Sequence, residues 1–282
     1  MKISAKKIWE RGALYSIITG FALFSVFPFY WMLIAMFKRD HDLFNPVANP
    51  FVFNEPATLE PVRMLIYDTL FLKYLLNTCV VGMSVVGITL LVSVPAAYSL
   101  ARWSGRWGEN LGVGIFLTYL VPPTLLFIPL SRMIGFFGLS ESLGSLILVY
   151  PTFTIPFCTW LLMGFFKSIP KDIEEQAMVD GCSRLGAMVK IVFPLSVSGI
   201  LTVVVFAFTL SMHEFIYALA FISVSAHKTI SIGVPTELVR GDVFRWGPLM
   251  AGALIASLPV AVMYTFFLDR FIAGFTMGAV KG

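Results

Sequence analysis

The stretch Tyr74–Ala101 reads YLLNTCVVGMSVVGITLLVSVPAAYSLA and contains no Asp, Glu, Lys or Arg. A helix needs about 20 consecutive, mostly apolar residues to cross the hydrocarbon core of a bilayer. Backbone polar groups in that core must bond one another, and a helix satisfies them within one segment. A membrane β-barrel would instead show alternating segments of about 10 residues. The stretch therefore predicts a transmembrane helix.

Five further windows of similar character extend this interpretation along the whole chain. In order, the six expected spans are residues 13–37, 74–101, 111–130, 143–166, 199–222 and 248–268. The first is longer than the roughly 7–15 apolar residues of a cleavable signal peptide, so we interpret it as a retained span. The composition agrees: 58% of residues are hydrophobic and 13% charged, whereas a soluble domain carries about a quarter charged residues. We expect an all-α membrane protein with six transmembrane helices in one domain, residues 13–282.

The distribution of Lys and Arg predicts the orientation, because cytosolic loops carry an excess of these residues. With the N-terminus inside, the inner segments hold twelve and the outer segments eight of the 20 basic residues. Both termini, including residues 1–12, are therefore expected in the cytosol, and the proline-containing segment 38–73 outside.

Prolines fall in five of the six windows. Proline removes a helix hydrogen bond and kinks the helix, and broken helices are common where a transport path opens and closes. Ordinary kinked packing is the equally compatible alternative. The prolines concerned are Pro28, Pro95, Pro122, Pro123, Pro151, Pro156 and Pro259.

The inner loop, residues 167–198, is long, charged and patterned. From Ser168 to Pro194 it reads SIPKDIEEQAMVDGCSRLGAMVKIVFP. Ser168 is suited to an N-cap with Pro170 in the first turn, and Gly181 to a left-handed helix end. A second short helix could begin at Ser183 and end at Pro194. We expect a helix–turn–helix hairpin that packs on its own bundle, lies against the membrane, or inserts into a groove on another protein.

Part of this loop resembles the EAA loop of ABC-importer permeases. The resemblance rests on Glu175-Gln176-Ala177, on Gly181 after three more residues, and on Pro194-Leu195. The wider loop, the run from Trp246 to Gly252 and the chain end at 278–282 are similar to the carbohydrate branch, especially the smaller permease of maltose-type importers. Two positions depart from the pattern: Gln176 replaces an Ala, and Met212-His213-Glu214-Phe215 stands where the family often has Trp-Asn-Glu-Phe.

The resemblance implies a type I importer permease fold in a bacterial inner membrane. It implies that the loop is a coupling helix in a cleft of a cytosolic ATPase, that Glu175 pairs with a basic residue of that ATPase, and that Ala177 and Gly181 permit close approach. The ATPase dimer would use ATP and magnesium, while this chain would bind no cofactor. A second homologous permease, a periplasmic solute-binding protein and membrane lipid would be the other partners, and the solute a sugar. The implied ATPase-coupling residues are Glu174, Glu175, Ala177, Asp180, Gly181, Lys281 and Gly282.

Catalysis by this chain is not expected. It contains no Gly-Lys dipeptide, so it has no Walker A phosphate loop, and His213-Glu214 lacks the second His of a zinc protease motif. It has no Cys-x-x-Cys, its three cysteines lie far apart, and no basic run with interleaved aromatics suggests nucleic acid.

Glu214 is a notable acid inside an expected span, and an intramembrane acid is a candidate functional residue. A hydrogen-bonded structural role, or a place at the water boundary, is the alternative. Asn77 and Tyr217 are further candidates for lining a solute path. The competing hypothesis is a secondary transporter driven by an ion gradient, although such proteins usually show internal repeats and several intramembrane acids. A membrane-embedded enzyme would need more convergent catalytic groups than His213 and Glu214.

Overall fold

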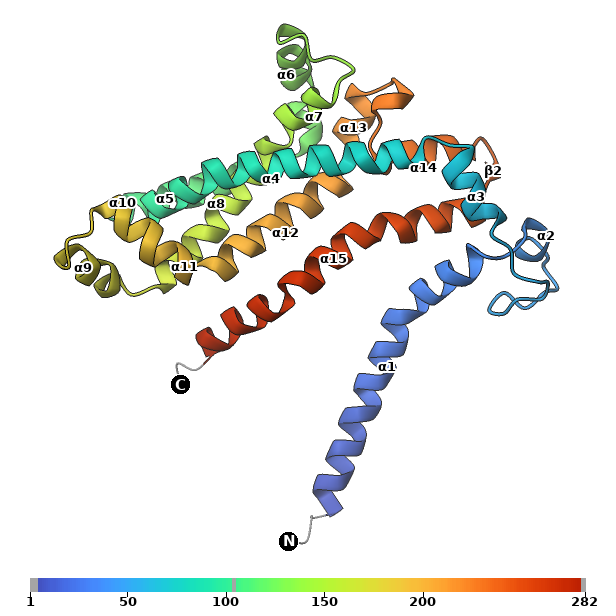
Figure 1. The fold of residues 1–282 in the computed structure, drawn as a ribbon, viewed down its shortest axis with the longest axis horizontal. Helices are drawn as coiled ribbons and strands as arrows, with labels where there is room; N and C mark the ends of the chain where they lie inside the picture. The colour runs from blue at the N-terminus through green and yellow to red at the C-terminus, as the bar shows by residue number, and fades with distance from the viewer. Residues whose placement is uncertain (1–4, 103–104, 280–282) are drawn as a thin grey trace. The chain divides into compact units, whose positions relative to one another are not determined.

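The computed structural model describes residues 5–102 and 105–279, and most of them are helical (Figure 1). The chain divides into two compact units. The first contains the described residues up to Phe71 together with Val234–Ser257, and the second contains Leu72–Gly233 and the residues from Leu258 on. The boundaries fall at the start of one helix and inside two others, so each unit is described separately.

The first unit begins with a long apolar helix and continues with short elements. Its elements are α1 (Ala5–Ala35), α2 (Asp40–Leu43), α3 (Glu60–Tyr67), the end of α14 (Ile230–Leu238), β1 (Val239–Arg240), β2 (Val243–Phe244) and the start of α15 (Trp246–Ala279). The two strands pair antiparallel, with Val239 opposite Phe244. Gly241 connects them with a φ of 59°, a conformation that glycine adopts without steric cost.

A buried ionic network holds the segment between α1 and α3. Lys38 Nζ lies 3.5 Å from Asp42 Oδ1, and both side chains are 1% exposed. Asn54 donates to Asp42 from its backbone N–H at 3.1 Å and from its side-chain amide at 2.7 Å. Burial opposes ionisation of Asp42, but the hydrogen bonds from Asn54 and the Lys38 ammonium outweigh it and lower the pKa of Asp42 below 3.8. The carboxylate therefore stays charged and orders this loop.

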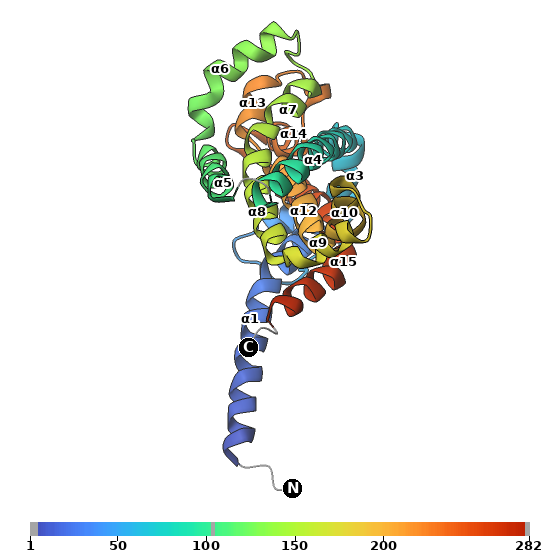
Figure 2. The same ribbon diagram turned by 90° about the vertical axis from the view of Figure 1, so that its left-hand side faces the viewer.

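The second unit contains most of the helices. They are α4 (Phe71–Arg102), α5 (Gly105–Tyr119), α6 (Pro123–Phe136), α7 (Leu143–Val149), α8 (Pro151–Ser168), α9 (Lys171–Val179), α10 (Arg184–Ala187), the π-helical turn η1 (Met188–Val192), α11 (Phe193–Leu195), α12 (Val197–His213), α13 (Ile216–Phe221) and the 3₁₀ turn η2 (Ser225–His227). In Figures 1 and 2, α5 and α12 both run beside α8.

An apolar core lies where α4, α6, α7, α13 and α14 meet. In a membrane, helix association depends on close van der Waals packing, since lipid is as apolar as the side chains themselves. Tyr150 and Tyr217 are the largest members of this core. Its buried residues are Val81, Val85, Leu130, Ile134, Leu146, Val149, Tyr150, Tyr217, Ala218, Phe221, Ile222 and Ile232.

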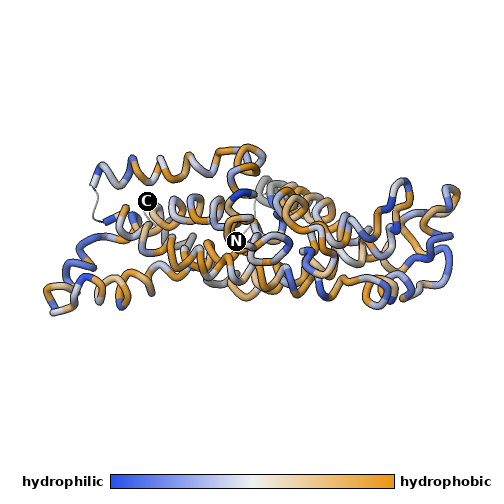
Figure 3. The backbone as a smooth tube through the Cα atoms, turned by 90° about the horizontal axis from the view of Figure 1, so that it is seen from above, coloured by the Kyte–Doolittle hydropathy of each residue, from blue (hydrophilic) through white to orange (hydrophobic). Residues whose placement is uncertain are grey.

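The described residues contain four helices that are long and apolar enough to cross a membrane, or up to six spans if each of two bent helix pairs counts as one. The four are Arg11–Ala35, Phe71–Arg102, Leu143–Ser168 and Trp246–Phe267. Each overlaps a window expected from sequence. Hydrophobic residues follow the helices, and hydrophilic ones gather in the connecting segments (Figure 3). The structure thus confirms the all-α membrane fold class.

The third and fifth windows do not form single straight helices. The third is split around Pro122-Pro123 into α5 and α6, which meet at 88°. Figure 2 shows the bend between these two helices. Two consecutive prolines remove two N–H donors and disfavour helical backbone before them. The fifth ends as α12 at His213, because Glu214 is extended with a ψ of 126°, and resumes as α13. By contrast, Pro28, Pro95, Pro156 and Pro259 lie inside continuous helices.

Candidate functional site

The loop at 167–198 forms the expected hairpin, with α9 as its first helix. The expected N-cap at Ser168 is wrong. Helix α8 runs on to Ser168, whose hydroxyl donates back to the Phe165 carbonyl at 2.7 Å. Pro170 therefore occupies the N-cap position of α9, and Asp172 and Glu174 lie in its first turn. Acidic side chains there complement the positive end of the helix dipole.

The turn of the hairpin confirms two sequence-based expectations. Gly181 has a φ of 94°, and its N–H donates to the Met178 carbonyl while that of Cys182 donates to Ala177. This pair of bonds is the Schellman ending that glycine favours. Ser183 then caps α10, because its Oγ accepts from the Gly186 N–H at 3.1 Å.

The second half of the hairpin does not stop at Pro194 as expected. Its helical backbone continues through η1 and α11, which contains Pro194, and then bends by 75° into α12. Proline is compatible with the first turn of a helix, where its missing N–H has no partner to lose. The hairpin is thus joined by helix to α12, and by the two residues Ile169 and Pro170 to α8.

The ATPase-coupling candidates lie on two different faces of the hairpin. Glu174 and Ala177 are buried, with 6% and 9% of their surface exposed. Glu175, Asp180 and Gly181 are exposed. Only the latter three are presented outward by this structure. Lys281 and Gly282, the remaining two candidates, lie outside the described residues.

Glu174 is held by the end of α4. Tyr98 donates a hydrogen bond to Glu174 Oε1, and Arg102 Nε lies 3.0 Å from Glu174 Oε2. The Arg102 side chain is 4% exposed and that of Glu174 8%. Arg102 Nη2 also donates to the Ile169 carbonyl at 3.0 Å. Neither Tyr98 nor Arg102 was predicted from the sequence, although polar side chains four residues apart at the end of an apolar window were an available signal.

Glu214 bridges the gap between α12 and α13. Its Oε1 accepts the Tyr217 N–H at 2.9 Å, and its Oε2 accepts the Ala218 N–H at 3.0 Å and the Tyr150 hydroxyl at 2.9 Å. The carboxylate thereby satisfies two of the backbone donors that a helix start leaves free. Tyr217 is buried, and its hydroxyl donates to the Pro123 carbonyl at 2.9 Å. Glu214 and Tyr217 therefore connect the breaks in the third and fifth windows.

Asn77 lies apart from these two residues. Its side chain is buried, and Nδ2 donates to the carbonyls of Ala226 at 3.0 Å and Lys228 at 2.9 Å. The structure therefore brings together Glu214 and Tyr217 but not Asn77.

A cavity of about 370 Å³ opens at the two helix breaks. It has aromatic walls, hydroxyl groups and one carboxylate. Its lining is Thr118, Tyr119, Val121, Pro123, Leu126, Thr152, Phe153, Leu210, His213, Glu214 and Tyr217. Such a mixture can surround a polar solute while presenting hydrogen-bonding groups to it.

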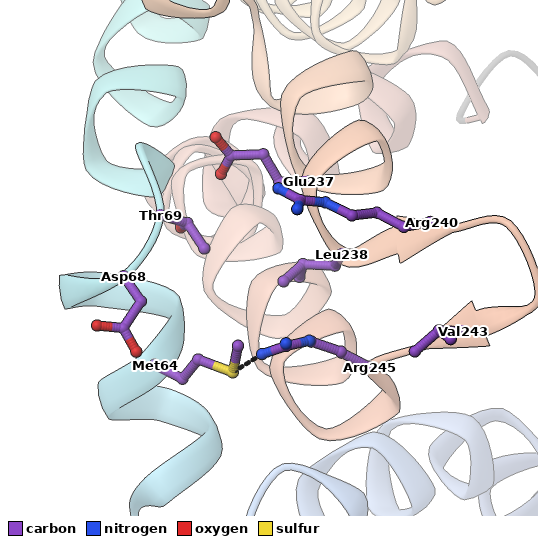
Figure 4. A pocket seen from close by; sticks show the side chains of 8 residues that line it. All are labelled: Met64, Asp68, Thr69, Glu237, Leu238, Arg240, Val243 and Arg245. Atoms are coloured by element: carbon purple, nitrogen blue, oxygen red, sulfur yellow. Dashed lines mark hydrogen bonds between the residues drawn. The ribbon is translucent and has the colours of Figure 1, made fainter.

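A larger cavity, of about 480 Å³, lies in the first unit (Figure 4). Asp68, Glu237, Arg240 and Arg245 contribute two charges of each sign to its lining. Arg245 Nη1 lies 3.1 Å from Met64 Sδ, the contact drawn in Figure 4. This cavity contains none of the residues selected from the sequence. In the described parts of both units, His, Cys, Asp and Glu gather nowhere in a group of three that could hold a metal ion.

The chain also matches a known protein family. The family described as binding-protein-dependent transport system inner membrane component matches residues 93–276, which include the hairpin and Glu214. The chain belongs to this family. The membership suggested by the EAA-like loop is thereby confirmed.

Relatives and a solved structure resemble this permease along nearly its whole length. It is 33% identical over 259 residues to the sulfoquinovosyl glycerol transport system permease protein SmoH of Agrobacterium fabrum, covering 91% of the permease and 89% of SmoH. It is 29% identical over 263 residues to the trehalose/maltose transport system permease protein MalG of Thermococcus litoralis, covering 93% of each. A chain of a bacterial ABC transporter involved in alginate import matches with a TM-score of 0.78 and 18% identity, covering 96% of the permease and 100% of that chain. This last match shows a shared fold.

Proposed function

We propose that this permease is a membrane-spanning subunit of an ATP-driven importer for a carbohydrate. With a second, homologous permease it forms the translocation path, and a periplasmic binding protein delivers the solute. The observation that carries this proposal is the hairpin of α9 and α10, inside the family-matched region, which presents Glu175, Asp180 and Gly181 outward.

The hairpin couples the path to a cytosolic ATPase dimer. Glu175 pairs with a basic residue of the ATPase, and Gly181, which carries no side chain, lets the ATPase approach the turn closely. Lys281 and Gly282 are proposed to take part in the same coupling. ATP and magnesium are used by the ATPase, and this chain binds no cofactor itself. Closure of the ATPase dimer moves the hairpin as a body, which biases the path between its inward- and outward-facing states.

The names of the relatives support a carbohydrate as solute. SmoH is named for sulfoquinovosyl glycerol and MalG for trehalose and maltose. A second solved structure of similar fold, with a TM-score of 0.64, is described as a bacterial alginate ABC transporter in complex with an alginate pentasaccharide-bound periplasmic protein. That description supports a binding-protein partner here.

The cavity of Glu214 and Tyr217 is the part of this chain that meets the solute. His213 is exposed beside it, and Thr118 and Thr152 add hydroxyls to the lining. Asn77 would join such a path only by giving up its two bonds to the 226–228 segment.

The chain is placed in the bacterial inner membrane with both termini in the cytosol. This orientation puts the hairpin on the side of ATP, and it follows from the excess of Lys and Arg in the inner segments.

The decisive experiment is affinity purification of the tagged chain from its native membrane, followed by reconstitution in liposomes. We expect a P-loop ATPase and a second permease to co-purify, and the complex to import a radiolabelled sugar only with ATP and the binding protein. Recovery of the chain alone, with uptake driven by a proton or sodium gradient, would instead establish a secondary transporter.

A further inference from the structure

Glu174 belongs to the hairpin in sequence but to the helical bundle in its contacts. Tyr98 and Arg102 of α4 hold both of its carboxylate oxygens, and Arg102 also binds the carbonyl of Ile169, just before α9. The Tyr98 ring is buried and meets Phe166 of α8 edge-on, with ring centroids 6.0 Å apart. Charge and hydrogen bonding thus fasten the first helix of the hairpin to α4, and the ring contact fastens α4 to α8.

The opposite end of α4 is fastened to the segment beside Glu214. Asn77 donates to the carbonyls of Ala226 and Lys228, and Thr78 Oγ1 accepts the Ile230 N–H at 2.8 Å. One residue further on, Ser231 Oγ donates to the Glu214 carbonyl at 2.8 Å. These bonds connect α4 to the backbone at the break between α12 and α13.

A single continuous helix separates these two sets of contacts. Asn77 and Arg102 are 25 positions apart, or roughly 38 Å along a helix at about 1.5 Å per residue. Helix α4 runs unbroken through Pro95. Pro95 removes one backbone hydrogen bond, but the helix continues on both sides of it, so we treat α4 as one element that moves as a unit.

We propose that α4 is a lever between the hairpin and the cavity of Glu214, and that Tyr98, Arg102 and Glu174 form the latch at its hairpin end. If α9 moved without α4, the Arg102–Glu174 pair would separate in a buried site, where an unpaired charge is strongly unfavourable. Movement of α9 therefore carries α4 with it. The three latch residues are positioning residues, and the inference rests on the proposed importer function.

The test compares ATP hydrolysis with transport in the reconstituted complex. Glu174→Gln removes the charge from the latch while keeping the size of the side chain. We expect ATP hydrolysis to persist and sugar uptake per ATP to fall roughly tenfold, the typical size of an allosteric coupling. A purely structural role would lower both activities together, in proportion to the amount of assembled complex.

Glu109→Gln is the matched control. Glu109 Oε1 lies 3.1 Å from Lys167 Nζ, an exposed ion pair between α5 and α8 that involves neither α4 nor the hairpin helices α9 and α10. The same chemical change there is expected to leave uptake per ATP unchanged. If Glu174→Gln prevents assembly, Tyr98→Phe serves as the milder variant, because it removes only one hydroxyl, and a twofold or larger fall in uptake per ATP is expected.

Normal uptake per ATP in an assembled Glu174→Gln complex, or in Tyr98→Phe where the first fails to assemble, would overturn the lever. Wild-type complex without ATP-dependent uptake would overturn the importer function instead, so the two failures are distinguishable.

Discussion

Glu174 and Glu175 are adjacent in the sequence, yet α9 turns by about 100° between them. That rotation directs one carboxylate into the chain, toward Arg102, and leaves the other exposed. The two neighbouring glutamates therefore have different roles. Glu174 fastens the hairpin to its own bundle, and Glu175 remains available to a partner.

Gly181 offers a test at the scale of a single residue. Its backbone has a φ of 94°. A residue with a Cβ pays about 1–2 kcal/mol to adopt such a left-handed conformation. We expect Gly181→Ala to raise the rate of amide hydrogen exchange across residues 171–187. Gly164→Ala is the control, because Gly164 is helical and a Cβ there meets no atom within 4 Å. Equal exchange rates in the two variants would contradict the strain argument.

Asp42 provides a test by pH. Its folded-state pKa is lowered below the ordinary 3.8. Its contribution to the stability of the fold is therefore complete above about pH 4 and is lost as the pH falls through the folded-state value. We expect the 38–58 segment to open below pH 4, measured by hydrogen exchange corrected for the intrinsic rate.

Asp42→Asn should bring that opening to neutral pH, because it leaves Lys38 buried without its counter-charge. Asp40→Asn, at an exposed position on the same short helix, should leave the pH dependence as it is. An Asp42→Asn segment as protected as wild type would show that the ion pair does not order the loop.

Elements of this protein break where backbone hydrogen bonds are lost and other groups replace them. Pro122-Pro123 ends α5, and the Tyr217 hydroxyl donates a hydrogen bond to the Pro123 carbonyl. Glu214 ends α12 and satisfies the first N–H groups of α13. Pro95 shows the opposite outcome, since α4 continues through it. Whether a proline bends or breaks a helix therefore depends on its neighbours.

The contact of α4 with α12 gives a prediction at the scale of elements. A Cβ at Gly82 would lie 2.8 Å from Cε2 of Phe208, a buried ring. Small residues allow such close approach between membrane helices. We expect Gly82→Ala to destabilise the protein by about 1–3 kcal/mol, a typical cost of overpacking, in unfolding titrations in mixed detergent micelles.

Gly87→Ala is the matched control in the same helix, since a Cβ there meets nothing within 4 Å. Alanine is the better helix former, so this change should be neutral or stabilising. Equal stability of the two variants would mean that the helices separate easily at Gly82.

For the whole molecule, the orientation in the membrane is the property to test. We expect Cys182, in the hairpin, to be labelled by a membrane-impermeant maleimide from the cytosolic side alone. A cysteine placed at Val47, which is 92% exposed, should be labelled from the outside alone. The comparison uses intact cells and inverted vesicles, with Cys79 and Cys158 replaced by Ser and Ala. The reverse pattern would invert the proposed topology.

The sequence alone determined the membrane class, the six windows, the hairpin with its caps at Gly181 and Ser183, and the family. These are local properties, since hydropathy, turn chemistry and capping depend on residues within one or two turns of each other. Tertiary structure decided where the third and fifth windows break and which hairpin residues face inward. It also decided that the Asn77 side-chain amide donates its hydrogen bonds to carbonyls of the 226–228 segment. The reason is distance along the chain: Tyr98 and Glu174 are 76 residues apart, and only the packing of α4 against the hairpin brings them together.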